Sequence, residues 1–289
     1  MNVIKKFLIQ TYNIGIIKKN IADIVGSDVV WGQTVGAVNR IHFLDFADDS
    51  IKRFSYAASF GNNFIPESNV KYLKKALSRF DAVSVREKES TTLLENIGIN
   101  GVEHVLDPTF LINGEEWKCM AKKPDVIPLD AKYVFVYVLG WNSNLAENVV
   151  KFAKNNGLLI VSISYANGYS DGNGLLSDGI LLDDCTPENF LWLLANSSIT
   201  ITDSFHGMAL STNMKKNFIA LRRDGKADIN SRINDFLQIS NQTEKMRSDS
   251  DLCNIKIEYA DSHTDYHELD KMISFSKKYL ENVLKIIEG

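Results

Sequence analysis

The sequence predicts an α/β fold built on parallel β-sheet, and three observations support this prediction. Short β-branched runs alternate along the chain with amphipathic helical segments, as they do in βαβ units. Residues 133–139 read Tyr-Val-Phe-Val-Tyr-Val-Leu and are apolar on both faces, as central parallel strands are. A polar stretch over residues 113–131, with Pro124 and Pro128, interrupts the alternation and is the predicted linker. The 289 residues suffice for one large or two ordinary domains.

The composition is typical of a globular protein with a real core, since 45% of the residues are apolar and 24% are charged. A net charge of −4 argues against general affinity for nucleic acid. Cys119, Cys185 and Cys253 lie far apart and show neither a metal-ligand spacing nor a disulfide framework. A reducing cytoplasm is therefore the expected setting.

No targeting segment is expected at the N-terminus. Gln10, Thr11 and Asn13 interrupt its apolar run, and no small-residue cleavage site follows, so we do not predict a signal peptide. No run in the chain approaches the roughly 18 apolar residues of a membrane span.

In the first part of the chain, the predicted strands are the short apolar runs over residues 21–25, 52–60, 82–85 and 102–106. Helices are predicted from Pro66 to about Phe80, with proline at the start, and from Ser90 to Ile97. Residues 1–20 are expected to form one or two short helices. Residues 41–46 are expected to form a hairpin or a short helix.

In the second part, further strands are predicted over residues 158–163, 199–202 and 217–221, and helices over residues 144–155, 188–195, 205–214, 229–237 and 266–287. Thr186 and Pro187 are the expected cap and first residue of the helix at 188. The four glycines in residues 166–179 lack the spacing of a dinucleotide fingerprint, so this loop is expected to be a lid or an insertion. Residues 240–262 are polar and poorly patterned.

The stretch from Ile199 to Leu210 is the most informative part of the sequence. Asp203 and Ser204 follow a buried strand and precede a helix, where their side chains can accept hydrogen bonds from the free N–H groups of the helix start. Ligands bind at such strand ends in open α/β sheets, and a helix start suits a phosphate or carboxylate. Gly207 is expected to let a ligand approach the backbone. His206 is a candidate functional group because histidine can change charge near neutral pH, although a plain hydrogen-bonding role is the alternative.

Other candidate site residues also stand near strand ends. Arg86 follows the strand at 82–85 and suits bidentate binding of a carboxylate or phosphate, with a surface ion pair to Glu87 or Glu89 as the alternative. Small residues ending in Ser59 leave room for a ligand or for a packed helix. Trp31 is expected near a strand end, where packing in the core or at its rim is the simpler interpretation.

A cationic loop follows the strand at 217–221 and contains Arg222, Arg223 and Lys226, and Arg232 lies in the next helix. His263 and His267, four residues apart and flanked by aspartates, could mimic a metal site. No third ligand is in view, so we predict a surface role for them and no metal.

Several of these residues belong to an ordered set of blocks that resembles the polysaccharide pyruvyl transferases. Thr202-Asp203-Ser204-Phe205-His206-Gly207 is similar to the family signature T-[DN]-S-F-H-G. The other blocks, in the family's order, are Gly26-Ser27-Asp28-Val29-Val30-Trp31, Phe43-Leu44-Asp45-Phe46, Ser55 to Gly61, Ser84-Val85-Arg86-Glu87, Asp107-Pro108-Thr109, Thr186 to Phe190, and Asn230-Ser231-Arg232-Ile233. Any one block alone is weak evidence for the resemblance, but the whole set in the same order is strong evidence.

The resemblance implies two Rossmann-like domains that face a cleft, as in GT-B glycosyltransferases. We predict an N-terminal domain at residues 1–128, a C-terminal domain at 129–262, and a C-terminal helix at 263–289 that packs back on the first domain. The first domain is expected to be shortened at its N-terminus, because family members usually carry about one more βα unit before the block at Gly26. Exposed sheet edges would need cover from residues 1–20 or from a second subunit, which would make the protein a homo-oligomer.

The resemblance also implies a reaction. Phosphoenolpyruvate would donate a carboxyethylidene group to two hydroxyls of a sugar in a surface polysaccharide or its lipid-linked precursor, as in exopolysaccharide or capsule synthesis. Phosphoenolpyruvate is then a donor substrate, and no cofactor is implied. The expected location is the cytoplasm. Contact with the inner face of the membrane stays open, because the C-terminal helix carries the lysines Lys271, Lys277, Lys278 and Lys285.

Carried onto this sequence, the catalytic positions fall on Arg86, His206 and Lys226. Arg86 and Lys226 would clamp the donor's carboxylate and phosphate from opposite sides of the cleft, and His206 would transfer protons. The remaining candidates are predicted to bind substrate, namely Asp28, Trp31, Ser59, Asp203, Ser204, Gly207 and Arg232.

Two other functions stay open at this point. One is a glycosyltransferase of the same shape that uses a nucleotide sugar, which would bind a nucleoside diphosphate but not phosphoenolpyruvate. The other is a non-catalytic relative that binds a sugar or an anion, which would bind phosphate or phosphoenolpyruvate without turning over any acceptor.

Overall fold

A computed structural model describes residues 21–33, 38–61, 63–140, 143–163, 179–222, 231–257 and 264–288. The predicted helices of residues 1–20, nearly all of the glycine-rich loop, Arg223, Lys226 and His263 lie outside the described residues. Within them the fold is α/β, and every strand pairing is parallel, as the sequence predicted.

The chain divides into two compact units, which are described separately. Unit 1 comprises Met1–Leu111, Lys226–Asp235 and His267–Gly289, and unit 2 comprises Ile112–Gly225 and Phe236–Tyr266. The whole of the predicted linker, residues 113–131, therefore belongs to unit 2. The division also falls inside helix α8 (Ser231–Ile239), whose first five residues belong to unit 1.

Unit 1 is built on short parallel strands in the order β1-β2-β3-β4, namely β1 (Ala22–Val25), β2 (Lys52–Ser55), β3 (Ser84–Val85) and β4 (Glu103–His104). Isolated bridges from Phe54 to Ala82 and from Ala58 to Val85 connect the β1–β2 pair to the β3–β4 pair. β2 is shorter than predicted because Ala57 has a φ of 50°, in the left-handed region that extended strands exclude.

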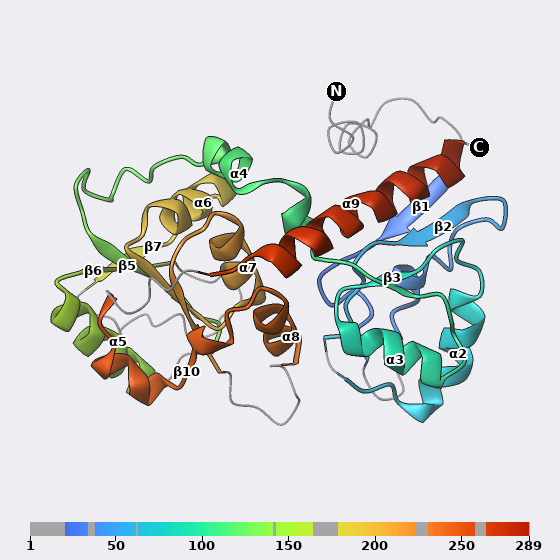
Figure 1. Ribbon diagram of the computed structural model, residues 1–289, viewed down its shortest axis with the longest axis horizontal. Coiled ribbons are helices and arrows are strands. Elements are labelled where there is room, and N and C mark those ends of the chain that lie inside the picture. The colour runs from blue at the N-terminus through green and yellow to red at the C-terminus, as the bar shows by residue number, and fades with distance from the viewer. Residues whose placement is uncertain are drawn as a thin grey trace. The chain divides into compact units, whose positions relative to one another are not determined.

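Two cores form on the two faces of this sheet, because side chains alternate along each strand. Val25 packs in one core, together with residues of α2 (Glu67–Leu77) and α3 (Lys88–Asn96), and η1 (Arg40–Phe43) adds Phe43. Ile24 packs in the other core with residues of α9 (His267–Glu288), which runs along the opposite side of the sheet in Figure 1. The short helix η2 (Pro108–Leu111) follows β4.

Helix α9 joins the C-terminal segment to unit 1 through its buried side. Tyr279 Oη donates a hydrogen bond to the carbonyl of Ser55 over 2.9 Å, and Ser276 Oγ accepts one from the backbone N–H of Leu106 at 2.9 Å. The other side of α9 is largely exposed and charged. Across the described part of the chain, no helix is long and apolar enough to span a membrane.

Unit 2 contains a six-stranded parallel sheet within the described residues, in the order β10-β9-β8-β5-β6-β7. The strands are β5 (Tyr133–Tyr137), β6 (Leu159–Ile163), β7 (Gly179–Leu182), β8 (Ile199–Thr202), β9 (Phe218–Leu221) and β10 (Met246–Arg247). This is the Rossmann strand order, and the chain reverses its direction of travel across the sheet between β5 and β8. β7 was not predicted.

Helices cover both faces of the unit 2 sheet. Val134 and Val136 pack in one core with α5 (Ser143–Asn156) and η4 (Asp249–Asn254), whereas Tyr133 and Phe135 pack in another with α6 (Pro187–Asn196) and α7 (Phe205–Asn213). The shorter helices of this unit are α4 (Gly114–Met120) and η3 (Thr243–Lys245). Thr186 caps α6 with Pro187 in its first turn, as predicted.

Candidate functional site

The β8–α7 turn lies at the topological switch point of the unit 2 sheet. β8 pairs with β5 on one side and with β9 on the other, so the turn follows a central strand. Its β-branched sequence makes β8 a fully buried strand, and a helix begins at Phe205 only three residues after its end. Ligands bind in α/β sheets outside the carboxyl ends of the strands at such a point.

Asp203 ties the ends of the two central strands together. Its Oδ1 accepts a hydrogen bond from the backbone N–H of Leu139 at 2.7 Å, and its Oδ2 accepts one from Gly140 at 3.1 Å. Thr202 adds a second tie, because its hydroxyl donates to the carbonyl of Tyr137 and accepts from the N–H of Ser204. The structure thus assigns Asp203, predicted to bind substrate, a bracing role that shapes the site.

Packing alone requires a glycine at position 207, and its predicted contact with a ligand stays a prediction. A Cβ at this position would lie 2.5 Å from Thr202 Oγ1 and 3.1 Å from Tyr137 Cδ1. The missing side chain therefore leaves room for the end of β8 beneath the first turn of α7. Ser204 occupies the N-cap position of α7, but its side chain makes no capping hydrogen bond.

His206 is the partly exposed residue of this turn, while its neighbours Asp203 to Phe205 are buried. Its ring lies edge-on to Phe205 at a centroid distance of 5.6 Å, and Phe205 in turn packs against Phe236 at 5.5 Å. The buried turn therefore places the histidine at the carboxyl end of β8.

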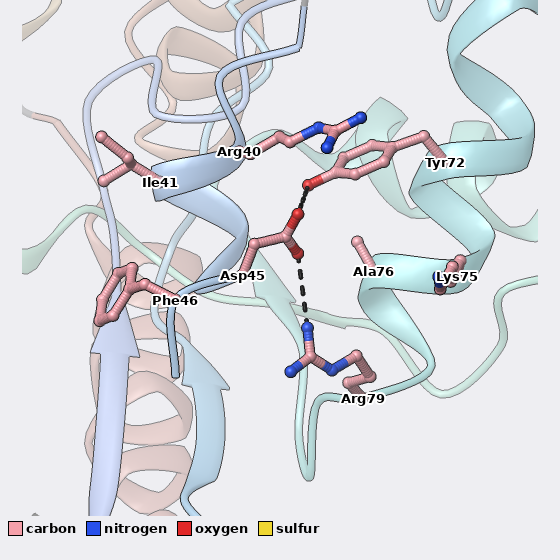
Figure 2. A pocket seen from close by; sticks show the side chains of 8 residues that line it. All are labelled: Arg40, Ile41, Asp45, Phe46, Tyr72, Lys75, Ala76 and Arg79. Atoms are coloured by element: carbon pink, nitrogen blue, oxygen red, sulfur yellow. Dashed lines mark hydrogen bonds and ion pairs between the residues drawn. The ribbon is translucent and has the colours of Figure 1, made fainter. Parts of the chain in front are cut away.

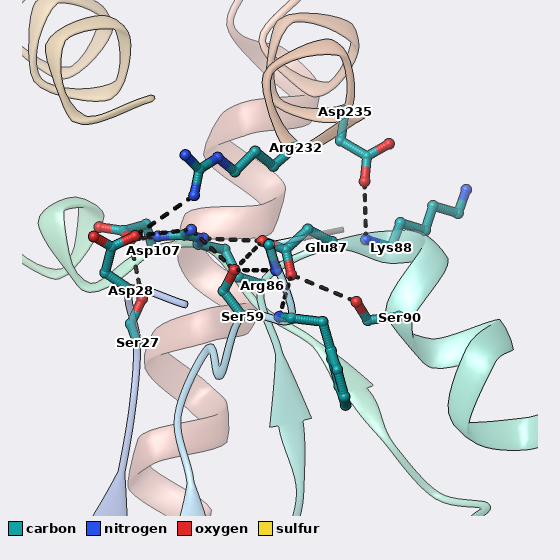
Figure 3. Close-up of polar contacts among 12 residues, drawn as sticks. Ser27, Asp28, Ser59, Arg86, Glu87, Lys88, Ser90, Asp107, Arg232 and Asp235 are labelled. Atoms are coloured by element: carbon teal, nitrogen blue, oxygen red, sulfur yellow. Dashed lines mark hydrogen bonds and ion pairs between the residues drawn. The ribbon is translucent and has the colours of Figure 1, made fainter. Parts of the chain in front are cut away.

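A second polar centre forms in unit 1, again at the carboxyl edge of a parallel sheet. Ser27 follows β1, Ser59 follows β2, Arg86 follows β3 and Asp107 follows β4. Four successive strand ends therefore supply polar side chains to one network, which Figure 3 shows gathered around the guanidinium of Arg86.

The guanidinium group of Arg86 is buried among oxygen acceptors. It donates from Nη1 to Asp107 Oδ2 at 3.0 Å, from Nη2 to Ser59 Oγ at 3.0 Å and Asp28 Oδ1 at 3.2 Å, and from Nε to Glu87 Oε1 at 3.3 Å. Burial opposes the charge of Arg86, but the carboxylates of Asp107 and Glu87 outweigh it, so the pKa of Arg86 is raised. The predicted pairing with Glu87 exists, but it is buried instead of lying on the surface.

The carboxylate of Glu87 also accepts several hydrogen bonds within this network. One of its carboxylate oxygens accepts a hydrogen bond from Ser59 Oγ at 2.5 Å, and the other accepts from Phe60 N at 3.3 Å and from Ser90 Oγ at 3.4 Å. Ser27 Oγ donates to Asp107 at 3.1 Å. These contacts fix the network in one geometry.

Asp28 is the exposed member of the network. Its side chain is 57% exposed, against 2% for Arg86 and 1% for Asp107. Arg232, from α8, lies on its other side with Nη1 3.8 Å from Asp28 Oδ1. Asp28 is therefore a carboxylate held by two guanidinium groups and open to solvent, and the structure brings together the predicted residues Asp28, Ser59, Arg86 and Arg232.

α8 makes a second contact with this region through Asp235. Asp235 Oδ2 accepts a hydrogen bond from the N–H of Lys88 at 3.1 Å, at the first residue of α3. Burial and the neighbouring carboxyl of Glu89 raise the pKa of Asp235 to about 7.

Trp31 is a core residue, which corrects its prediction as a substrate contact. Its side chain is fully buried, stacks on Phe43 at a centroid distance of 5.3 Å and donates from Nε1 to the carbonyl of His42 at 2.9 Å. A side chain without exposed surface has no face to offer a ligand. Lys226, predicted as the second cation of the donor clamp, lies outside the described residues.

Sequence reasoning missed three participants, namely Glu87 as a buried anchor, Asp107 and Asp235. Asp107 carried a usable signal, because a carboxylate directly after a predicted strand belongs at the same sheet edge as Arg86. Asp235 carried none, because it lies in the middle of an amphipathic helix. Among the described residues, no three or more histidine, cysteine, aspartate or glutamate side chains are placed so that they could hold a metal ion.

The architecture is that of the GT-B class. The structure resembles a putative UDP-N-acetylglucosamine 2-epimerase from Listeria monocytogenes with a TM-score of 0.57 and 14% identity, over 88% of this chain and 68% of that chain. It also resembles the UDP-GlcNAc 2-epimerase from Methanocaldococcus jannaschii with a TM-score of 0.54 and 13% identity, over 94% of this chain and 72% of that chain. These likenesses establish the fold alone.

The chain belongs to the polysaccharide pyruvyl transferase family, whose family model matches residues 5–225. The matched range includes the Arg86 network up to Asp107 and the whole β8–α7 turn. No curated protein matches the chain.

Proposed function

We propose that the protein transfers a pyruvyl group from phosphoenolpyruvate to two hydroxyls of a sugar in a surface polysaccharide or its lipid-linked precursor. Membership of the pyruvyl transferase family supports the reaction class. The observation that carries the assignment of the site is the position of His206, which is partly exposed on the first turn of a helix at the switch point between β5 and β8. This is where an open α/β sheet offers helix N–H groups to an anion.

The chemistry needs proton transfers that a histidine can perform. The methylene carbon of phosphoenolpyruvate takes up one proton, and the adjacent carbon is then attacked by the two sugar hydroxyls in turn. The C–O bond to phosphate breaks and two C–O bonds to the sugar form. The proton of the first hydroxyl replaces the one given to the methylene carbon, and the proton of the second leaves with the phosphate. We assign the proton delivery at the donor to His206, because its imidazole is the partly exposed side chain of this turn and can both donate and accept a proton. The reaction in this form uses no further cofactor.

The unit 1 centre suits a sugar better than an anion. Two guanidinium groups, Arg86 and Arg232, face the three carboxylates of Asp28, Glu87 and Asp107, so the network carries a net negative charge. Such a network repels a phosphate-bearing donor but accepts hydrogen bonds from hydroxyls. We therefore propose that Asp28 accepts a hydrogen bond from an acceptor hydroxyl and that Arg86 positions Asp28. The cationic clamp on the donor is then left to Lys226 and the helix start.

The first experiment is calorimetric titration of phosphoenolpyruvate into the wild type and the His206→Gln, Asp28→Asn and His42→Gln variants. His42 is a partly exposed histidine outside both centres and serves as the matched control. We expect saturable binding in the wild type and in the Asp28 and His42 variants, with weakened binding in the His206 variant. Loss of donor binding in the Asp28 variant would overturn the division of roles proposed here.

Turnover is tested by phosphate release from phosphoenolpyruvate in the presence of a panel of p-nitrophenyl hexosides. Release should depend on the acceptor and should fall by roughly 10²–10⁴-fold when His206 is replaced, as for a lost general acid. Binding of UDP-N-acetylglucosamine but not of phosphoenolpyruvate would favour a nucleotide-sugar enzyme. Donor binding without release for any acceptor would favour a non-catalytic relative.

A further inference from the structure

A cavity of about 530 Å³ lies in unit 1, away from the Arg86 network. It is formed between η1 with its following turn and the side of α2 that carries Tyr72, Lys75 and Ala76. The cavity belongs to neither of the two centres described above, and Figure 2 shows the side chains that line it.

One wall of the cavity is an ordered polar cluster. Tyr72 Oη donates to Asp45 Oδ2 at 2.8 Å, and Arg79 Nη1 lies 3.4 Å from the other oxygen of Asp45. Arg79 is also paired with Asp49 at 3.0 Å. The charges of Asp45 and Arg79 are thus already engaged within the protein.

Two further cations line the cavity. The guanidinium carbon of Arg40 lies 5.3 Å from the centroid of the Tyr72 ring, and Lys75 is exposed on α2. Within the described part of the chain, no carboxylate forms an ion pair with either of them. Arg40 and Lys75 therefore give the cavity an uncompensated positive charge.

Two large apolar side chains of the cavity lining are exposed, and we call them the apolar rim. Ile41 is 67% exposed and Phe46 is 68% exposed, and both line the cavity. Two large exposed apolar side chains close to uncompensated cations are the features of a surface that meets both acyl chains and anionic headgroups.

We propose that this cavity and its rim form a docking site for an anionic lipid surface. Ile41 and Phe46 enter the apolar part of the bilayer, and Arg40 and Lys75 bind lipid phosphates. Charge complementarity favours this occupant over a neutral apolar partner, because the two cations would lose hydration without gaining a counter-charge. The proposal is independent of the reaction assigned to the protein, although a lipid-linked acceptor would be presented at such a surface.

Co-sedimentation with vesicles tests the proposal on the full chain. The wild type should bind vesicles that contain phosphatidylglycerol, and binding should weaken with added salt and be lost with pure phosphatidylcholine. Arg40→Gln together with Lys75→Gln should weaken binding by roughly fivefold for each charge removed. Ile41→Ser together with Phe46→Ser should weaken it by about tenfold or more.

Two matched controls decide between this surface and others. Leu129→Ser removes an apolar side chain that is 87% exposed in unit 2, and Lys277→Gln with Lys278→Gln removes two exposed charges from α9. Both controls should bind vesicles as the wild type does. Loss of binding in the α9 variant, with retention in the Arg40 and Lys75 variant, would overturn the proposal and place the contact on the C-terminal helix.

An excess of inorganic phosphate separates a lipid surface from a free anion as the occupant. Phosphate should reduce vesicle binding only as much as an equal ionic strength of chloride does. A stronger effect of phosphate, together with calorimetric binding of phosphate that is lost in the Arg40 and Lys75 variant, would show a soluble-anion site and contradict the lipid assignment. All variants should keep the urea unfolding midpoint of the wild type, which shows that they are folded.

Discussion

Arg86 and Asp107 form an ion pair with Nη1 and Oδ2 3.0 Å apart, and neither side chain is more than 2% exposed. The pair joins the ends of β3 and β4 at the centre of the unit 1 network. Its burial decides what the removal of either partner does, because an uncompensated buried charge is far more costly than a lost surface contact.

Replacing Arg86 by alanine is expected to lower the free energy of unfolding by about 3–5 kcal/mol, because it leaves Asp107 and Glu87 without a counter-charge. Asp107→Ala should cost less, since Arg86 keeps Glu87 and Asp28. Urea unfolding measures both, and the exposed pair Lys118–Glu115 is the control, for which Lys118→Ala should cost less than about 1 kcal/mol. Equal small effects for Arg86 and Lys118 would show that the network is not rigidly buried.

Gly207→Ala is expected to destabilise unit 2 by about 1–3 kcal/mol, because the added methyl group meets Thr202 Oγ1 at 2.5 Å. Ser204→Ala, three residues earlier, should cost less than the roughly 1 kcal/mol of a typical N-cap, since Ser204 makes no side-chain capping bond. Thermal and urea unfolding compare the two. A neutral Gly207 variant would mean that α7 shifts easily against β8.

Asp235 should make stability depend on pH. Its pKa is raised to about 7 by burial and by Glu89, whereas an unfolded aspartate titrates near pH 3.9, so the folded state holds the proton more tightly. The contribution of this group to stability therefore falls as pH rises from about 4 to about 7 and is constant above. Asp235→Asn should remove this fall in stability. The free energy of unfolding of the variant, relative to that of the wild type, should therefore rise between pH 5 and pH 8.

Urea midpoints across that range provide the measurement for Asp235. The exposed Asp130→Asn variant should follow the wild-type pH curve. Glu89→Gln should move the Asp235 titration to lower pH, because it removes the neighbouring negative charge. A variant curve at Asp235 that is parallel to the wild type would contradict the assignment.

Two contacts of α9 should differ in their importance. Ser276→Ala leaves the buried N–H of Leu106 without its acceptor and is expected to cost about 1–3 kcal/mol. Tyr279→Phe removes a bond to the Ser55 carbonyl, which still accepts from Ser84 Oγ at 2.8 Å, so its cost should stay near 1 kcal/mol or below. Denaturant unfolding of the two variants tests this order.

Much of the fold could be predicted because local patterns and tertiary structure agree in unit 2. The β-branched run at 199–202 forms β8 with the predicted bounds, and the Thr186 cap begins α6. β7 was missed because its apolar residues follow a glycine-rich stretch that reads as loop. β7 forms because it pairs with β6, and the local sequence alone does not predict this strand.

The candidate sites were predictable only in part. The ends of the strands could be located from the sequence. The prediction that Asp28, Ser59, Arg86 and His206 lie near the carboxyl ends of strands is therefore confirmed. Which side chain shields another depends on tertiary contacts, and for this reason Trp31 was wrongly placed in a site and Arg86 was not expected to be saturated by carboxylates. The packing of Gly207 against Thr202 could not be predicted, because the two residues lie in different elements.

Unit 1 is assembled from segments that lie far apart in the sequence, so its folding depends on the order in which they are synthesised. The bond between Tyr279 and Ser55 spans 224 residues. At about 5–20 residues per second, a ribosome needs roughly 10–45 s to cover that length. During that time the apolar side of β2 that α9 later covers stays open on the nascent chain. A chain released before α9 is synthesised would keep this apolar surface of β2 exposed. We expect such a chain to need chaperones to avoid aggregation.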